Sequence, residues 1–277
     1  IFTSNEATTD FVVGDVTVSG GSLSNFAASS SSVFTATFTP SSAGATSIDV
    51  GASVFTDAAG NGNTAASQFN WTFDNSSAEL SNVSISSDNA TSTLAKASDV
   101  ITLVFSANET INTPTVTFAS GGSTIESGRV SLSNTSGNNW SASYTTGASD
   151  SDGAVTYSIA FSDAGGNEGV PVTSGSGSVT FDNTRPVSSI SSAQVGNGGA
   201  TNAGLIAVAF GLSDSTTEFN AADVSVSGGS LSDFSGSGTS YSATFTPDGD
   251  GTKTIQIVRA AYTDAAGNVS WATGEFS

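Results

Sequence analysis

The residues best suited to chemistry in this sequence are carboxylates that recur in one short loop pattern. An aspartate is followed by small residues, a glycine and an asparagine at Asp57–Asn61, Asp163–Asn167 and Asp264–Asn268. An aspartate side chain can accept hydrogen bonds from the backbone two residues on, and Gly-Asn tolerates positive φ. Each copy therefore predicts a tight loop. Carboxylate and amide oxygens are also the ligands that Ca²⁺ takes in proteins, so each loop is a candidate part of a calcium site.

Further acidic residues lie where they could complete such a site. Glu109 follows a predicted central strand, and Asp74 with Asn75 precedes the repeat that holds Asp163. The third copy has matching candidates in Asp182, Asn183 and Asp214, whereas the first has Glu6 and no preceding linker. The candidate calcium ligands are Glu6, Asp57, Asn61, Asp74, Asn75, Glu109, Asp163, Asn167, Asp182, Asn183, Asp214, Asp264 and Asn268.

The alternative interpretation of these residues needs no metal. Asp57, Asp163 and Asp264 would only cap their turns, while Glu109 and Asp214 would lie in solvent. The spacing of an EF-hand loop is absent, so no known calcium loop decides the question. A cation would nevertheless have a physical role, because carboxylates held close together in low dielectric repel one another and a divalent ion reverses that interaction.

Alternating apolar residues predict the strands that must position these loops. In the middle of the chain Val155, Tyr157, Ile159 and Phe161 alternate up to Asp163, and no helical period of useful length is present. About seven short strands, with turns every 8–12 residues, are typical of an immunoglobulin-like sandwich. Such a sandwich brings the loop after its second strand and the loop before its last strand to one pole. We therefore expect an all-β chain of tandem immunoglobulin-like β-sandwiches, elongated overall.

The repeat interval of about 100 residues predicts three domains. We place them at residues 1–74, 75–183 and 184–277. The first lacks a counterpart of the N-terminal strand, and the last strand of the third is incomplete. The chain starts at Ile1 without a signal peptide, so one explanation is a processed chain or a segment of a longer tandem array. The other is that the ends complete each other between chains by strand donation, which would build a fibre.

Composition excludes several classes of function. The net charge is −19, with five Lys and Arg against 24 Asp and Glu, which makes nucleic acid an implausible partner. Cys and His are both absent, so disulfides, thiol nucleophiles, imidazole zinc sites and histidine-based triads are excluded. No apolar run approaches the roughly 20 residues of a transmembrane helix, so we expect no membrane insertion. The acidic, hydroxyl-rich composition fits an extracellular setting.

The first and third domains share a longer motif that resembles a known family. The segment Phe11–Phe26 matches Phe219–Phe234, Phe34–Pro40 matches Tyr241–Pro247, and the Asp loop follows both. This combination resembles the bacterial Ig-like repeat domains of large secreted adhesins and biofilm-associated surface proteins. The middle domain keeps the strand order and the Asp loop without the Gly-Gly-x-Leu-Ser segment. The resemblance implies a spacer or stalk at the cell surface, in some cases with calcium at domain junctions, and no enzyme.

Two further roles stay open at this stage. The chain could be a subunit of an extracellular filament that assembles by strand exchange with identical chains. It could also be a module that binds a glycan or a cell-surface partner, in which case Trp71, Trp140 and Trp271 are candidate platforms. Trp71 alternates with Phe69 and Phe73, so we expect it in the core, and we expect packing in the core or at a strand edge for the other two. Acidic pairs on surface turns give no indication of a glycosidase cleft.

Overall fold

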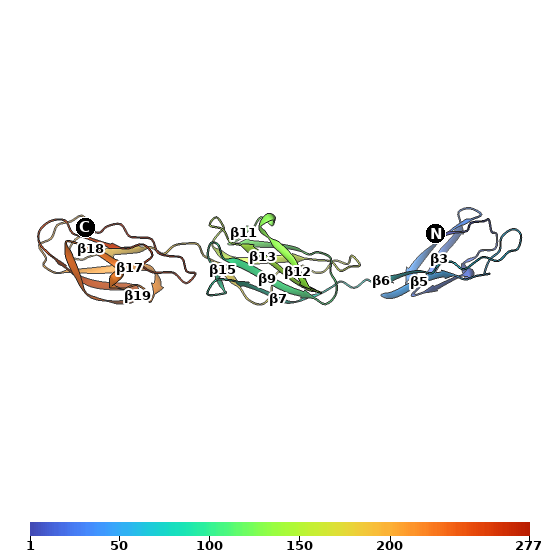
Figure 1. The fold of residues 1–277 in the computed structure, drawn as a ribbon, viewed down its shortest axis with the longest axis horizontal. Coiled ribbons are helices and arrows are strands. Elements are labelled where there is room, and N and C mark those ends of the chain that lie inside the picture. The colour runs from blue at the N-terminus through green and yellow to red at the C-terminus, as the bar shows by residue number, and fades with distance from the viewer. The chain divides into compact units, whose positions relative to one another are not determined.

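The computed structural model describes residues 1–277 and consists almost entirely of β-strands. The strands form six sheets that fall into three successive pairs along the chain, and the strands of each pair can be followed in Figure 1. Three short 3₁₀ turns are the only helical elements. No helix has the length and apolar character needed to cross a membrane. The predicted all-β class is therefore confirmed.

The first pair of sheets is built from residues 2–73. One sheet has the order β1-β4-β3 and the other has the order β2-β5-β6. Phe38 of the first sheet and Trp71 of the second meet with their ring centroids 4.8 Å apart, so the two sheets face each other. No strand pairs with the other edge of β1. The elements are β1 (Phe2–Thr3), η1 (Val13–Asp15), β2 (Val16–Ser19), β3 (Gly21–Ala28), β4 (Val33–Pro40), β5 (Gly44–Val50) and β6 (Phe69–Phe73).

The second pair of sheets is the largest. A five-stranded sheet β11-β10-β14-β15-β8 faces a four-stranded sheet β12-β13-β9-β7, and the Phe118 and Tyr144 rings meet between them at 5.0 Å. The elements are β7 (Leu80–Ser87), β8 (Leu94–Ala95), β9 (Val100–Ala107), β10 (Thr115–Ser120), β11 (Ser123–Thr124), η2 (Ser127–Arg129), β12 (Ser131–Ser136), β13 (Asn139–Thr145), β14 (Gly153–Ala160) and β15 (Val179–Phe181).

The third pair of sheets repeats the plan of the first. Its sheets have the orders β16-β17-β19 and β18-β20, and the long strand β19 covers the stretch that β3 and β4 occupy in the first pair. Phe276 forms a single bridge with Ile255, which matches the pairing of Phe69 with Ile48. The elements are β16 (Ser188–Ser191), β17 (Ile206–Thr216), η3 (Ala221–Asp223), β18 (Val224–Ser227), β19 (Gly229–Pro247) and β20 (Thr254–Ile257).

The period-two alternation of the sequence becomes a buried face in each sandwich. In β9, Ile101, Leu103 and Phe105 are fully or almost fully buried while the residues between them are more exposed. Side chains alternate between the two faces of a strand, so one face of β9 fills the core. The third pair buries an aromatic cluster, in which the ring centroids of Phe219 and Tyr241 lie 5.1 Å apart.

The chain divides into two compact units. The first comprises Ile1–Glu79, Glu109–Pro114 and Phe161–Val170. The second comprises Leu80–Asn108, Thr115–Ala160 and Pro171–Ser277. The first unit therefore combines the first pair of sheets with two loops that follow β9 and β14, and these loops hold Glu109 and Asp163.

Candidate metal centre

Three carboxylates from distant parts of the sequence meet in the first unit. Asp74 directly follows β6, Glu109 lies two residues after β9, and Asp163 begins the Asp loop after β14. One carboxylate oxygen from each residue lies within 4.8 Å of the other two. Asp163 is fully buried, and the other two are partly buried. The structure thus brings together three of the candidate ligands, although they are far apart in the chain.

The Asp163 carboxylate is oriented by its own loop. Its Oδ1 accepts a hydrogen bond from the backbone N–H of Asn167 at 2.8 Å, and its Oδ2 accepts one from the Asn167 side-chain amide at 2.8 Å. The Asn167 side chain is the main cause that lowers the pKa of Asp163, so this carboxyl is ionised at neutral pH. Each carboxylate oxygen has two lone pairs, so both oxygens retain capacity for a cation.

Asn167 also ties the loop to the segment that carries Asp74. Its side-chain nitrogen donates to the backbone carbonyl of Asp74 at 3.2 Å, and the backbone N–H of Ser76 donates to the Asp74 carboxylate at 3.0 Å. The loop itself is anchored by Asn112, whose side chain donates to the Asp163 carbonyl at 2.6 Å. Because the nitrogen of Asn167 faces these acceptors, this asparagine positions the site, and the ligands that the geometry offers are the three carboxylates.

The third Asp loop has the same internal hydrogen bonds. Asp264 accepts from the backbone N–H and the side chain of Asn268, both at 2.9 Å, and Asn268 donates to the Asp182 carbonyl at 2.8 Å. No cluster of three carboxylates forms here, however. Burial, with a smaller contribution from nearby Asp264, raises the pKa of Asp182, and the Asp214 carboxylate accepts a hydrogen bond from Ser213 at 2.5 Å.

The two predicted asparagine ligands of the linkers make no hydrogen bond with the loop aspartates Asp163 and Asp264. Asn75 is exposed and makes no hydrogen bond with the carboxylates. The Asn183 side chain donates to the Ala148 carbonyl at 3.3 Å, and its backbone N–H donates to Asp152 at 2.8 Å. Asn183 therefore fixes its own segment to the turn before β14 and does not face Asp264.

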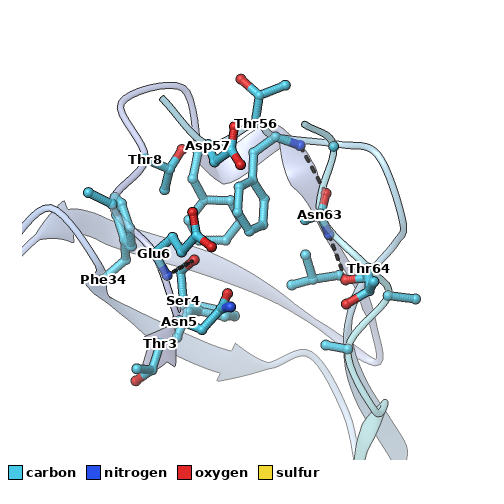
Figure 2. Close-up of a pocket in the computed structure, with 18 of the residues that line it drawn as sticks. Thr3, Ser4, Asn5, Glu6, Thr8, Phe34, Thr56, Asp57, Asn63 and Thr64 are labelled. Carbon is cyan, nitrogen blue, oxygen red and sulfur yellow. Dashed lines mark hydrogen bonds between the residues drawn. The ribbon is translucent and has the colours of Figure 1, made fainter. Parts of the chain in front are cut away.

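The first Asp loop lies beside an open pocket. Asp57 accepts hydrogen bonds from the backbone N–H and the side chain of Asn61 at 2.8 and 2.7 Å, and the side chain is the main cause that lowers its pKa. Asp57, Asn61 and Glu6 line a cavity of about 790 Å³ whose apolar wall includes Phe11 and Phe34. Figure 2 shows Glu6 in the middle of this pocket with Asp57 nearby. Only two carboxylates of the candidate set are present here.

Two carboxylates that fix the first and third Asp loops, Asp10 and Glu218, were not predicted from the sequence. Both Asp10 carboxylate oxygens accept from the backbone N–H of Thr56 at 3.0 Å, and Glu218 accepts from the backbone N–H of Thr263 at 2.9 Å. Asp10 and Glu218 each directly precede the phenylalanine that starts the repeated segment, which is the signal that could have identified them. They hold the residue before each loop aspartate in place.

The three tryptophans differ in their surroundings. Trp71 is partly buried against Phe38, and Trp140 is partly buried in β13. Trp271 is 51% exposed and lies outside any strand, so the expectation that it packs in the core or at a strand edge was wrong. Trp71, which we expected in the core, has ring contacts with the partly buried Phe38 and with Phe69, which is 65% exposed.

The sequence profile of the bacterial Ig-like domain family matches residues 1–73 and 182–276. The chain belongs to this family. The two matched stretches carry the repeated motif noted in the sequence, and the unmatched middle stretch folds into the second pair of sheets. The predicted tandem immunoglobulin-like sandwiches are therefore confirmed, as is the resemblance to bacterial Ig-like repeats.

Solved structures similar to this bacterial Ig-like chain include two tandems from titin. The titin domains Z1Z2 in complex with telethonin are 10% identical over 72% of this chain and 96% of that one, with a TM-score of 0.28. The titin I9–I11 tandem is 9% identical over 96% of this chain and 88% of that one, also with a TM-score of 0.28. Both TM-scores are low. No curated protein sequence matches the chain.

Proposed function

We propose that this chain is a spacer segment of an extracellular adhesin or surface fibre, and that Ca²⁺ bound by Asp74, Glu109 and Asp163 stiffens it. The tandem domains 1–74, 75–183 and 184–277 would serve as repeated units of fixed length, with neighbouring repeats as partners and without any catalytic step. Membership of the bacterial Ig-like family supports the structural role. The cluster of three carboxylates is the single observation that supports the cation.

The electrostatics of the cluster favour a divalent ion. Three carboxylates whose oxygens lie within 4.8 Å of one another repel when all are ionised. The chain has few cations to relieve this repulsion, with five Lys and Arg in total, and none of its three ion pairs involves these carboxylates. Ca²⁺ takes 6–8 oxygen ligands and accepts carboxylates with water completing the shell. A bound ion would tie the segment after β6 to the loops after β9 and β14.

The test is a calcium titration of the whole chain with a matched pair of variants. Glu109→Gln removes one carboxylate of the cluster, and Asp214→Asn removes the corresponding one from the third copy. Ca²⁺ at about 100 times its Kd should stabilise the wild type by about 2.7 kcal/mol, and a chelator should reverse the effect. Glu109→Gln should lose most of this gain, whereas Asp214→Asn should keep it. Thermal melting and calorimetric titration both measure it, with NaCl of equal ionic strength as the control for screening.

Two results would contradict the calcium assignment. One is an equal Ca²⁺-dependent rise in Tm for Glu109→Gln and wild type, which would place binding elsewhere. The other is the same rise with NaCl alone, which would reduce the effect to screening. Neither result would bear on the spacer role. Stiffening by Ca²⁺ predicts that small-angle scattering of the chain gives a narrower range of dimensions with Ca²⁺ than with chelator.

A second candidate role, assembly of identical chains into a filament by strand exchange, has one supporting observation. The outer edge of β1 is unpaired, and the pocket beside it is lined by Phe11, Phe34 and Phe55. An unpaired strand edge next to apolar side chains can accept a strand from another chain. Sedimentation over a range of concentrations tests this: a filament-forming chain grows with concentration, and a constant mass contradicts it.

A further inference from the structure

Two arginines lie against one exposed tryptophan in the second unit. The guanidinium carbon of Arg185 is 4.8 Å from the centroid of the Trp271 ring, and that of Arg259 is 5.4 Å from it. Trp271 is 51% exposed and Arg259 is exposed. The backbone N–H of Trp271 donates to the carbonyl of Pro186 at 3.1 Å, which holds the tryptophan beside the segment that carries Arg185. We call Arg185, Arg259 and Trp271 the arginine–tryptophan cluster.

The charges of this cluster are not neutralised within the chain. Of the five basic residues, Lys96, Arg129 and Lys253 each form an ion pair with an aspartate. Arg185 and Arg259 form none, although the chain contains 24 acidic residues. Arg185 donates one hydrogen bond, to the Val269 carbonyl at 3.3 Å, and Arg259 has no hydrogen bond. Each of the two guanidinium groups beside Trp271 therefore keeps donors that no acceptor of the chain satisfies.

The fold itself does not require the cluster. The first pair of sheets has an equivalent loop, in which Ser53 takes the place of Ala260. Both residues have a positive φ of 59°, and the backbone N–H of each donates to a backbone carbonyl across its own loop. Ala52 and Thr64 occupy the places there that Arg259 and Trp271 occupy in the third pair. Since the same loop closes with an alanine and a threonine, the arginine and the tryptophan are not needed to form it.

We propose that the arginine–tryptophan cluster binds an acidic sugar, whose carboxylate or sulfate group is held by the guanidinium groups while its ring packs against the exposed part of Trp271. A guanidinium group donates paired hydrogen bonds to a planar or tetrahedral oxyanion, and these bonds are stronger than those between neutral groups. The exposed apolar surface of the indole suits the C–H face of a pyranose ring. This binding goes beyond the spacer role, because it would give one domain a ligand of its own.

The size of the cluster and the charge of the chain favour a sugar over a larger partner. Three side chains cover far less than the roughly 800 Å² per partner of a stable protein interface. Nucleic acid needs many clustered cations, and a net charge of −19 opposes it. The same charge opposes a second copy of the chain. One or two sugar units match the area, and the one or two oxyanions they carry match the two positive charges.

The experiment is calorimetric titration of the whole chain with three oligosaccharides of equal length. An oligogalacturonate carries only carboxylates, a sulfated galactan oligosaccharide carries only sulfates, and an unmodified galactan oligosaccharide is neutral. Chelator is present throughout, because oligogalacturonate itself binds Ca²⁺. At least one charged sugar should bind and the neutral one should not, and binding should weaken as salt is added. The arm that binds identifies the oxyanion.

A set of variants locates the binding. Arg259→Gln and Trp271→Leu should each weaken binding at least tenfold, and Arg259→Lys should weaken it less than Arg259→Gln. Lys253→Gln removes the same charge from another loop and should leave binding within twofold of wild type. Arg259 is exposed and forms no hydrogen bond or ion pair, so Arg259→Gln should keep the wild-type Tm. The proposal is overturned if neither charged sugar binds at millimolar concentration, or if Arg259→Gln binds as well as wild type.

Discussion

The side-chain amide of Asn268 bridges the third Asp loop and the backbone of Asp182, which lies far earlier in the chain. It donates to the Asp182 carbonyl at 2.8 Å and to the Asp264 carboxylate at 2.9 Å. Asn167 makes the same pair of contacts with Asp74 and Asp163 in the middle loop. The repeated Gly-Asn therefore does more than close a turn: its asparagine attaches the segment that enters the repeat to the loop.

Asn268→Ala should destabilise the fold by about 1–3 kcal/mol, because it leaves buried acceptors without their donor. Asn268 is only 8% exposed. The matched control is Asn61→Ala, since Asn61 is exposed and bonds only its own loop. Urea unfolding measures both changes in the free energy of unfolding. Equal losses for the two variants would show that the contact with Asp182 adds nothing.

Asp10 should make the first unit sensitive to acid. Hydrogen bonds lower the pKa of Asp10 from 3.8 to about 2, and the largest effect is that of the Thr8 side chain, followed by those of Thr56. The folded pKa lies below the unfolded one, so the ionised form stabilises the fold above pH 3.8, and this contribution is lost as the pH falls towards 2. Asp10→Asn should be less stable than wild type at neutral pH, and this difference in stability should shrink as the pH falls from 3.8 to about 2.

Hydrogen exchange of peptides from residues 1–73, followed as a function of pH, measures this effect. Asp233→Asn is the control, because Asp233 is an exposed aspartate outside the first unit. A constant difference between Asp10→Asn and wild type from neutral pH to pH 2 would contradict the assignment to Asp10.

The ion pair of Arg129 with Asp150 should contribute more to stability than that of Lys253 with Asp248. Two Arg129 nitrogens donate to the Asp150 carboxylate, and the Asp150 side chain is only 4% exposed, whereas that of Asp248 is 65% exposed. Asp150→Ala should cost about 1.5–3 kcal/mol, because hydrogen bonds to charged groups are lost. Asp248→Ala should cost about 0–1 kcal/mol. Thermal melting of both variants separates the two, and the reverse order would refute the prediction.

Gly177→Ala should disrupt the approach to β15. Gly177 has φ +77°, and a Cβ at this position would lie 2.2 Å from the Ile85 carbonyl oxygen. Gly122 has φ +84° with open space around it, so Gly122→Ala carries only the backbone strain, about 1–2 kcal/mol. Gly177→Ala carries the same strain and a steric clash, and its Tm should fall further. Similar Tm values for both variants would show that the backbone near Gly177 adapts.

Much of the fold follows from local sequence pattern. Alternation in Val155–Phe161 and in Phe34–Phe38 predicts strands because side chains of a strand alternate between two faces, and only one face meets the core. The small residues and Gly-Asn after Asp163 predict a tight loop by the same kind of local chemistry. The pairing of Glu109 and Asp74 with that loop could also be anticipated, because the order of strands in a sandwich brings these segments to one pole.

What only the tertiary structure decides depends on distances between segments far apart in the sequence. The sequence marks Asp74, Glu109 and Asp163 as candidates in the same way as Asp182, Asp214 and Asp264, yet only the first three converge within 4.8 Å. It marks Trp271 as a candidate platform but does not connect it with any arginine, and packing alone places Arg185 and Arg259 against its ring. Local pattern determines which residues can form strands and turns. The distances between charged groups on different loops depend on side-chain packing and strand register. No short stretch of sequence specifies either of these.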